Sequence, residues 1–213
     1  MNNQLIITFI FLLSFQNSIS SEKKVIKLPE PQKEGGMPLY EALNKRQSLR
    51  NFNNSIKITP EIISQALWSC YGVNREKNNL RTIPSARLWY PLIIYVFLDD
   101  GIYLYDSIQH SLTKIIKGDY RKLTGTQKFA GDARMNILLV ADFKKKSPTM
   151  DDPHKMRSLY MESGHCAMAL GLFAAANNMK GVERAMINHD PLLKLLKLNK
   201  DDYIITLAFS LGY

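Results

Sequence analysis

The sequence of 213 residues predicts one α+β domain, in which helices and strands mix without regular strand–helix–strand alternation. Short apolar runs bounded by turn residues indicate buried strands, and two pairs of a capping residue followed by proline indicate helix starts. The apolar fraction of 46% and the charged fraction of 22% are those of an ordinary folded protein, so the core needs no disulfide.

The first 20 residues have the features of an export signal. The apolar run at residues 5–15 is too short to cross a bilayer comfortably, and Ser18 and Ser20 provide the small residues for cleavage after position 20. We expect residues 1–20 to be a signal peptide and the protein to be exported, periplasmic or extracellular, without stable membrane association after cleavage. An uncleaved membrane anchor is the alternative.

Local patterns predict the elements of the mature chain. Prolines and paired glycines at residues 21–38 indicate an extended lead-in that is not packed, followed by a short helix at 39–45. Thr59 and Pro60 start a helix that ends at Gly72. Apolar runs predict strands at residues 92–98, 102–105, 136–141 and 203–211.

Two further helices are expected. A long one covers about residues 154–179 and ends at Gly181, and its small residues allow close packing on one side. Asp190 and Pro191 then cap and start a short leucine-rich helix. Because strands and helices do not alternate regularly, the pattern favours an α+β sheet domain over a doubly wound one.

The net charge of +9 leaves nucleic acid, an acidic surface or an anionic cofactor as partners. We expect no nucleic-acid partner, because the sequence has no zinc-finger pattern, RNA-binding signature or basic helix. Cys70 and Cys166 lie in apolar stretches and belong to no metal-binding pair. We expect no metal and two buried free thiols, with a disulfide as the alternative in an exported protein.

Arg46, Ser48 and Arg50 stand at alternating positions directly after the first expected helix. In an extended segment these side chains point to one face, and two guanidiniums with a hydroxyl form an anion site that suits phosphate. By itself the pattern is weak, since solvated arginines are more common than phosphate clamps.

Three blocks in this order resemble FMN-dependent nitroreductases. Residues 28–52 resemble the family's lead-in, short helix and R-x-S-x-R/K segment, and residues 82–91 (TIPSARLWYP) resemble the loop that lies against the flavin. Residues 101–106 (GIYLYD), 110–112 (HSL) and 162–165 (ESGH) are similar to the SagB-type, thiazole/oxazole dehydrogenase-like branch.

The resemblance spans residues 28–213 and implies a nitroreductase-like fold for a domain at 39–213. That fold has a central, mostly antiparallel sheet flanked by helices, in an intertwined homodimer with FMN at the subunit interface. By the family pattern, Arg46 and Ser48 would hold the phosphate and ribityl oxygens with help from Gln47. Arg50 would lie near the N1/O2 edge of the flavin.

The other implied cofactor-binding residues lie in the second and third blocks. Pro84, Ser85 and Ala86 would contact the flavin ring from the neighbouring subunit, and Glu162 and Gly164 would complete the site. A plain turn at Pro84 and Ser85, and close helix packing at Gly164, are the alternatives. No catalytic side chain is assigned, because the flavin does the chemistry.

The sequence also departs from the family pattern. Arg87 replaces a glycine, and residues 167–169 (AMA) lack the family's amide side chains. No basic residue follows Gly212, so the phosphate clamp relies on the 46–50 segment, with Arg87 or Arg184 as further candidates. His165 is expected to be an interior histidine rather than a catalytic acid.

The implied function is an FMN-dependent oxidoreductase that moves two electrons through flavin N5 by a ping-pong mechanism. Its partners would be NAD(P)H or another small-molecule donor, and an acceptor. Export favours a different donor, or a SagB-type dehydrogenase that oxidises a peptide or small molecule. A flavin-binding module without turnover and a cofactor-free basic surface protein are the remaining hypotheses.

Overall fold

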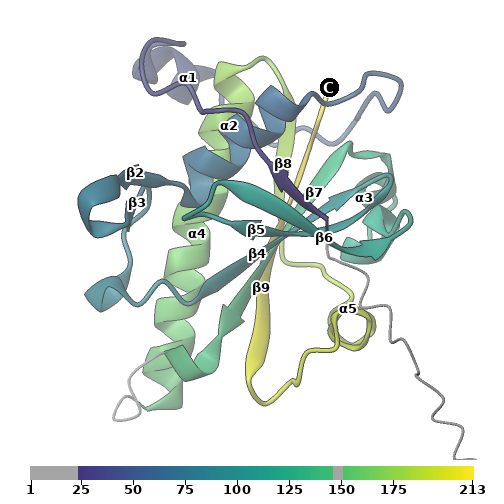
Figure 1. Ribbon diagram of the computed structural model, residues 1–213. Coiled ribbons are helices and arrows are strands. Elements are labelled where there is room, and N and C mark those ends of the chain that lie inside the picture. Colours follow the sequence, from purple (N-terminus) through teal and green to yellow (C-terminus); the bar gives the residue numbers. More distant parts are fainter. Residues whose placement is uncertain (1–23, 146–150) are drawn as a thin grey trace, which may run out of the picture.

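The computed structural model describes residues 24–145 and 151–213, so the expected signal peptide lies outside the described residues. Seven strands form the main sheet: β1 (Val25–Lys27), β4 (Leu92–Leu98), β5 (Gly101–Asp106), β6 (Ser111–Lys117), β7 (Met135–Asp142), β8 (Lys180–Arg184) and β9 (Tyr203–Gly212). Their order is β1-β6-β5-β4-β7-β9-β8, and every neighbouring pair is antiparallel (Figure 1).

Helices cover both faces of this sheet (Figure 1). α2 (Pro60–Tyr71) and α4 (Asp152–Ala176) pack on one face, and α5 (His189–Leu196) packs on the other. Alternate residues of β7 face the two sides, with Ile137 toward α2 and α4 and Leu138 toward α5. Because both faces are buried, residues 137–141 of β7 form an unbroken apolar run. The predicted α+β class with a central antiparallel sheet is confirmed.

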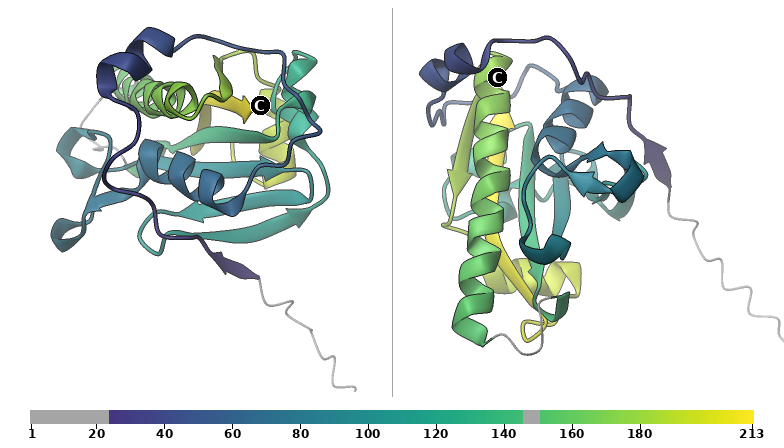
Figure 2. Two further views of the ribbon diagram at one scale, coloured as in Figure 1. Left: turned by 90° about the horizontal axis from the view of Figure 1, so that it is seen from above. Right: turned by 90° about the vertical axis from the view of Figure 1, so that its left-hand side faces the viewer.

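The remaining elements lie around the main sheet and its covering helices. α1 (Leu39–Lys45) packs against α4, and Figure 2 shows the two side by side. β2 (Val73–Arg75) and β3 (Leu80–Arg81) form a separate hairpin after α2. A short helix, α3 (Phe129–Asp132), precedes β7. Single-turn helices occur at Glu76–Asn78, Ala86–Leu88, Arg121–Thr124 and Phe143–Lys145.

Helix boundaries agree in part with the predicted ones. α2 begins as expected, with the Thr59 side chain accepting a hydrogen bond from the backbone N–H of Ile62. The long helix ends at Ala176 instead of residue 179, and Gly181 lies in β8 rather than at a helix end. α5 begins at His189, so the expected capping role of Asp190 is wrong.

The sequence does not predict β1, β6 and β8. β1 and β8 are the edge strands of the sheet, where few apolar residues are needed, and β6 carries lysines between its apolar residues. β1 also corrects the expectation of an unpacked lead-in, since Val25–Lys27 pairs with β6 and Leu28 is buried.

Arg184 on β8 is a buried cation held by neutral acceptors. Its guanidinium donates to Ser210 Oγ at 2.9 Å, to Thr124 O at 2.8 Å, and to Thr124 Oγ1 and Asn136 Oδ1 at 3.0 Å each. The side chain is only 2% exposed, and burial lowers its pKa to about 10. Arg184 therefore connects β8 to β7, to β9 and to the single-turn helix Arg121–Thr124. The expectation that it contributes to the phosphate clamp is wrong.

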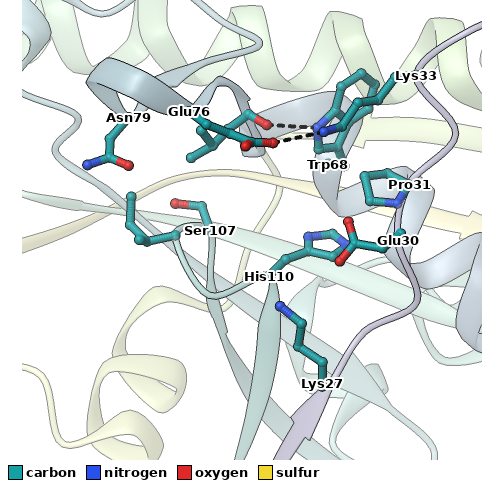
Figure 3. A pocket seen from close by; sticks show the side chains of 11 residues that line it. Lys27, Glu30, Pro31, Lys33, Trp68, Glu76, Asn79, Ser107 and His110 are labelled. Carbon is teal, nitrogen blue, oxygen red and sulfur yellow. Dashed lines mark hydrogen bonds and ion pairs between the residues drawn. The ribbon is translucent and has the colours of Figure 1, made fainter.

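A second buried polar network fastens the lead-in. His110 Nε2 lies 2.7 Å from Ser64 Oγ, and its Nδ1 lies 2.9 Å from the hydroxyl of Tyr105. Because Ser64 donates to Pro29 O at 2.5 Å, we assign the proton to Nε2, and Tyr105 donates to Nδ1. Figure 3 shows the imidazole beside Glu30 in a polar pocket between the lead-in and the β5–β6 turn.

Acid should weaken the fold through His110. Burial lowers the pKa of this imidazole below its ordinary value of 6.5, so the unfolded chain takes up the proton first. The stability contributed by neutral His110 is fully present above pH 6.5, the pKa of the unfolded chain. It is lost as the pH falls from there through the lowered pKa of the folded protein. We expect the melting temperature to fall as the pH decreases from about 6.5 through this lowered pKa, and His110→Gln to flatten this dependence. The exposed His189→Gln should keep the wild-type slope; an unchanged slope in His110→Gln contradicts the assignment.

Candidate active site

The 46–50 segment leaves α1 and runs beside β8, where Leu49 N donates to Gly181 O at 3.0 Å. Arg46, Gln47 and Ser48 line a cavity of about 290 Å³ whose other walls are α4, β8 and β9. The Arg46 stem lies along α4 at Gly171, where a Cβ would meet Arg46 Cγ at 3.7 Å, an ordinary van der Waals distance.

Arg46 is exposed and forms no ion pair with any described residue, whereas the neighbouring Lys45 pairs with Glu41 at 2.8 Å. Arg50 does not line the cavity, and its Nη1 lies 3.4 Å from the carbonyl oxygen of Ser48. The structure thus brings three of the four residues predicted in this segment together and leaves Arg50 outside.

A second cluster joins the 82–90 loop to α4. Ser85 Oγ donates to Glu162 Oε2 at 2.8 Å and accepts from Tyr90 N at 2.9 Å. Glu162 is only 2% exposed, while Pro84 and Ala86 on either side of Ser85 are exposed. Pro84 and Ser85 are therefore more than a plain turn, because Ser85 holds a buried carboxylate.

One strip of α4 connects the two clusters. Gly164 and Gly171 are seven positions apart, so they lie on the same helix face about 10 Å from each other. A Cβ at Gly164 would meet nothing within 4 Å, so close helix packing does not explain this glycine. The strip passes from near Glu162, in the middle of α4, to Arg46, and it carries the exposed Met168 between the glycines.

The loop beyond Ser85 has an unusual backbone. Arg87, Leu88 and Tyr90 have φ angles of 51°, 58° and 45°, in the left-handed region that favours glycine. Arg87 is the residue that the resemblance sets in place of a glycine, and its guanidinium carbon lies 5.5 Å from the centre of the Trp89 ring. Backbone strain of this kind gathers at functional sites, where the surrounding structure maintains it.

Replacing Arg87 by glycine should stabilise the protein. Glycine adopts the observed left-handed conformation without a Cβ clash, and we expect a gain of about 1 kcal/mol in the free energy of unfolding. Arg87→Ala is the matched control, because it removes the same charge and keeps the Cβ. Urea unfolding compares the two variants, and equal stability would show that the backbone at Arg87 is not strained.

Other expectations for single residues have mixed outcomes. Cys70 and Cys166 are free and fully buried, as expected, and burial raises the pKa of the Cys70 thiol to about 12. His165 is exposed, so its expected interior position is wrong. No sequence pattern pointed to Arg81 as a site residue, yet it contacts Tyr90 at the end of the 82–90 loop.

Within the described residues, no helix is long and apolar enough to cross a membrane.

Known proteins are similar to this chain in sequence or in fold. A Methanocaldococcus jannaschii protein named as a nitroreductase is 28% identical over 185 residues, which cover 82% of this chain and 90% of that protein. A Ralstonia eutropha crystal structure, likewise named, has 30% identity and a TM-score of 0.83, with 91% of each chain covered. A Desulfovibrio desulfuricans structure, named as a nitroreductase in complex with FMN, shares the fold at 17% identity and a TM-score of 0.59, covering 84% of this chain and 87% of its own.

The profile of the Nitroreductase family matches residues 43–213, which include the 46–50 segment, the 82–90 loop and α4. The predicted nitroreductase-like fold is confirmed by this match together with the sheet order and the Ralstonia structure. The chain belongs to the nitroreductase family.

Proposed function

We propose that the protein is an FMN-dependent oxidoreductase, with the flavin phosphate at residues 46–48 and the flavin ring near Glu162. The proposal is carried by one observation: the residues expected to bind phosphate line a single cavity against α4, and Glu162, which accepts a hydrogen bond from Ser85, lies on the same helix. FMN requires a cationic clamp and an apolar wall. Here Arg46 has no ion-pair partner among the described residues, and Gly164 and Gly171 add no side chain to this face of α4.

When bound, FMN supplies two-electron acceptance and release at N5. The contribution of the chain is binding and orientation. Arg46 would provide charge-assisted hydrogen bonds to the phosphate, and Ser85 holds the Glu162 carboxylate in one position. Arg50 is exposed near the clamp and remains our candidate for a cation at the flavin edge. In a ping-pong scheme the donor and the acceptor enter the same pocket in turn, so no separate dinucleotide site is needed.

The site is proposed to lie in a homodimer. α1 and α4 expose Tyr40 (85%), Met161 (58%) and Met168 (44%), which are large apolar side chains beside the cavity helix. Exposed apolar patches of this kind mark interaction surfaces, and a second copy of the chain is their simplest cover. In the intertwined dimer, Pro84 and Ala86, which flank the Ser85 that binds Glu162 of the same chain, would contact flavin at the subunit interface.

The second candidate is a SagB-type dehydrogenase that oxidises a peptide or small molecule. It is favoured by the 101–106 and 110–112 blocks and by the expected export of the protein, since reduced nicotinamide is not expected outside the cytoplasm. However, Tyr105 and His110 of these blocks are buried in the network that fastens the lead-in, so they support the fold rather than the chemistry.

Anaerobic titration of the purified, flavin-loaded protein separates the candidates. We expect NADH or NADPH to bleach the flavin absorption and a nitroaromatic acceptor to restore it. Yellow protein that neither nucleotide reduces would overturn the nitroreductase assignment. In that case, bleaching by a peptide or small-molecule substrate would identify a dehydrogenase, and no bleaching by any donor would identify a binding module.

A further inference from the structure

Arg81 places a guanidinium between two tyrosine rings beneath the 82–90 loop. Its Cζ lies 4.0 Å from the centre of the Tyr71 ring and 4.5 Å from the centre of the Tyr90 ring. The two rings also meet edge-on, with their centres 6.3 Å apart. Tyr71 is only 2% exposed, so this cation is held against the protein interior rather than in solvent.

The hydrogen bonding of this guanidinium is incomplete. Arg81 Nε and Nη1 are buried, and neither has a hydrogen-bond partner among the described residues. Burying a charged N–H group without an acceptor is unfavourable, and the π faces of the two tyrosines offset only part of this cost. Arg81 belongs to the β2–β3 hairpin, but the stability of this hairpin does not explain a buried guanidinium with unpaired N–H groups.

A continuous set of contacts leads from Arg81 to the candidate site. The backbone N–H of Arg81 donates to the Tyr90 hydroxyl at 3.2 Å, and Tyr90 N donates to Ser85 Oγ, which in turn donates to Glu162. The Tyr71 hydroxyl accepts from Leu92 N at 3.0 Å, which fixes the other ring to the start of β4. The clamp therefore holds both ends of the loop that presents Ser85.

Arg81 and Glu162 also interact electrostatically with the same two groups, the Tyr71 hydroxyl and the Cys166 thiol. Glu162 is the one buried carboxylate among the described residues. Burial raises the pKa of the Tyr71 hydroxyl, with the Arg81 charge opposing this rise and the Glu162 charge adding to it. Burial also raises the pKa of the Cys166 thiol, and Glu162 and Arg81 again act in opposite directions. Arg81 and Glu162 thus act with opposite sign on the pKa of the same ring and the same thiol.

We propose that Arg81 is a positioning residue of this site: clamped between Tyr71 and Tyr90, it holds the 82–90 loop in its strained form and balances the charge of Glu162. The loop part of this inference concerns the chain alone, and the charge part rests on the proposed flavin function. Without the Arg81 cation, the negative charge of Glu162 beside the flavin is no longer balanced. The anionic reduced form of the flavin then becomes less favourable.

Three variants test the proposal: Arg81→Met, Arg81→Lys and the control Lys77→Met, which removes one exposed charge from the same hairpin. The first readout is trypsin cleavage after the exposed Arg87 in flavin-free protein. We expect Arg81→Met to be cut at least tenfold faster than wild type, Arg81→Lys to be cut faster as well, and Lys77→Met to match wild type. The second readout is the midpoint potential of bound FMN, which should fall in Arg81→Met and be restored toward the wild-type value in Arg81→Lys.

The outcomes separate the inference from the proposed function. A folded Arg81→Met with the cleavage rate and potential of Lys77→Met would overturn the role of Arg81. If Arg81→Met does not fold, Arg81→Lys decides, because a wild-type cleavage rate in that variant contradicts the stacked clamp. Wild-type protein that binds no FMN would overturn the proposed function and the charge-balancing role, while the cleavage assay would still test the clamp.

Discussion

Replacing Arg46 by alanine should abolish FMN retention, with a loss of affinity of at least about a hundredfold. Charge-assisted hydrogen bonds from a guanidinium to phosphate are among the strongest that a surface site offers, and Arg46 is the only cation among the residues that line the cavity. The Arg46 charge is also not committed to a carboxylate among the described residues, so its loss removes phosphate binding rather than a structural ion pair.

The matched control is Lys45→Ala. Lys45 directly precedes Arg46 at the end of α1, is exposed and pairs with Glu41, so the variant removes the same charge from the adjacent position. Equilibrium titration with FMN should give a dissociation constant close to the wild-type value for Lys45→Ala. An Arg46→Ala protein that purifies with full flavin would refute the clamp.

Replacing Arg184 by methionine should destabilise the fold by about 3–5 kcal/mol. Methionine fills a similar volume but leaves the acceptors on Thr124, Asn136 and Ser210 without the guanidinium. Unsatisfied buried acceptors carry most of this loss, because the cation itself has no carboxylate partner and is unfavourable to bury.

Chemical unfolding measures this effect. Arg184→Lys retains a charge but cannot reach all the acceptors, so its stability should lie between those of wild type and Arg184→Met. Lys194→Met, an exposed position on α5, should change the free energy of unfolding by less than about 0.5 kcal/mol. Equal stability of Arg184→Met and Lys194→Met would contradict the structural role of Arg184.

The sequence predicts most of the fold because its strongest signals are local. Thr59 and Pro60 mark the start of α2, and the unbroken apolar run of β7 reflects helices on both faces of the sheet. The edge strands β1 and β8 escape prediction because their partners and their burial are set by distant residues: Val25 pairs with Thr113, and Arg184 pairs with Ala208.

The candidate site is less predictable than the fold, because the sequence does not distinguish arginines by burial. Arg46 and Arg184 look alike in the sequence, yet one is exposed against α4 and the other is enclosed by neutral acceptors. Arg81 follows no periodic pattern, and its position between two tyrosines depends on the β2–β3 hairpin and on α2. The left-handed backbone at Arg87 likewise appears only in the structure.

The most direct test of the account is FMN binding by purified protein that begins after residue 20, followed by its visible flavin absorption. The account predicts yellow protein, or colourless protein that becomes yellow when FMN is added, with one FMN per chain and with binding lost in Arg46→Ala and retained in Lys45→Ala. Folded protein that shows no flavin absorption after FMN is added in excess would contradict it.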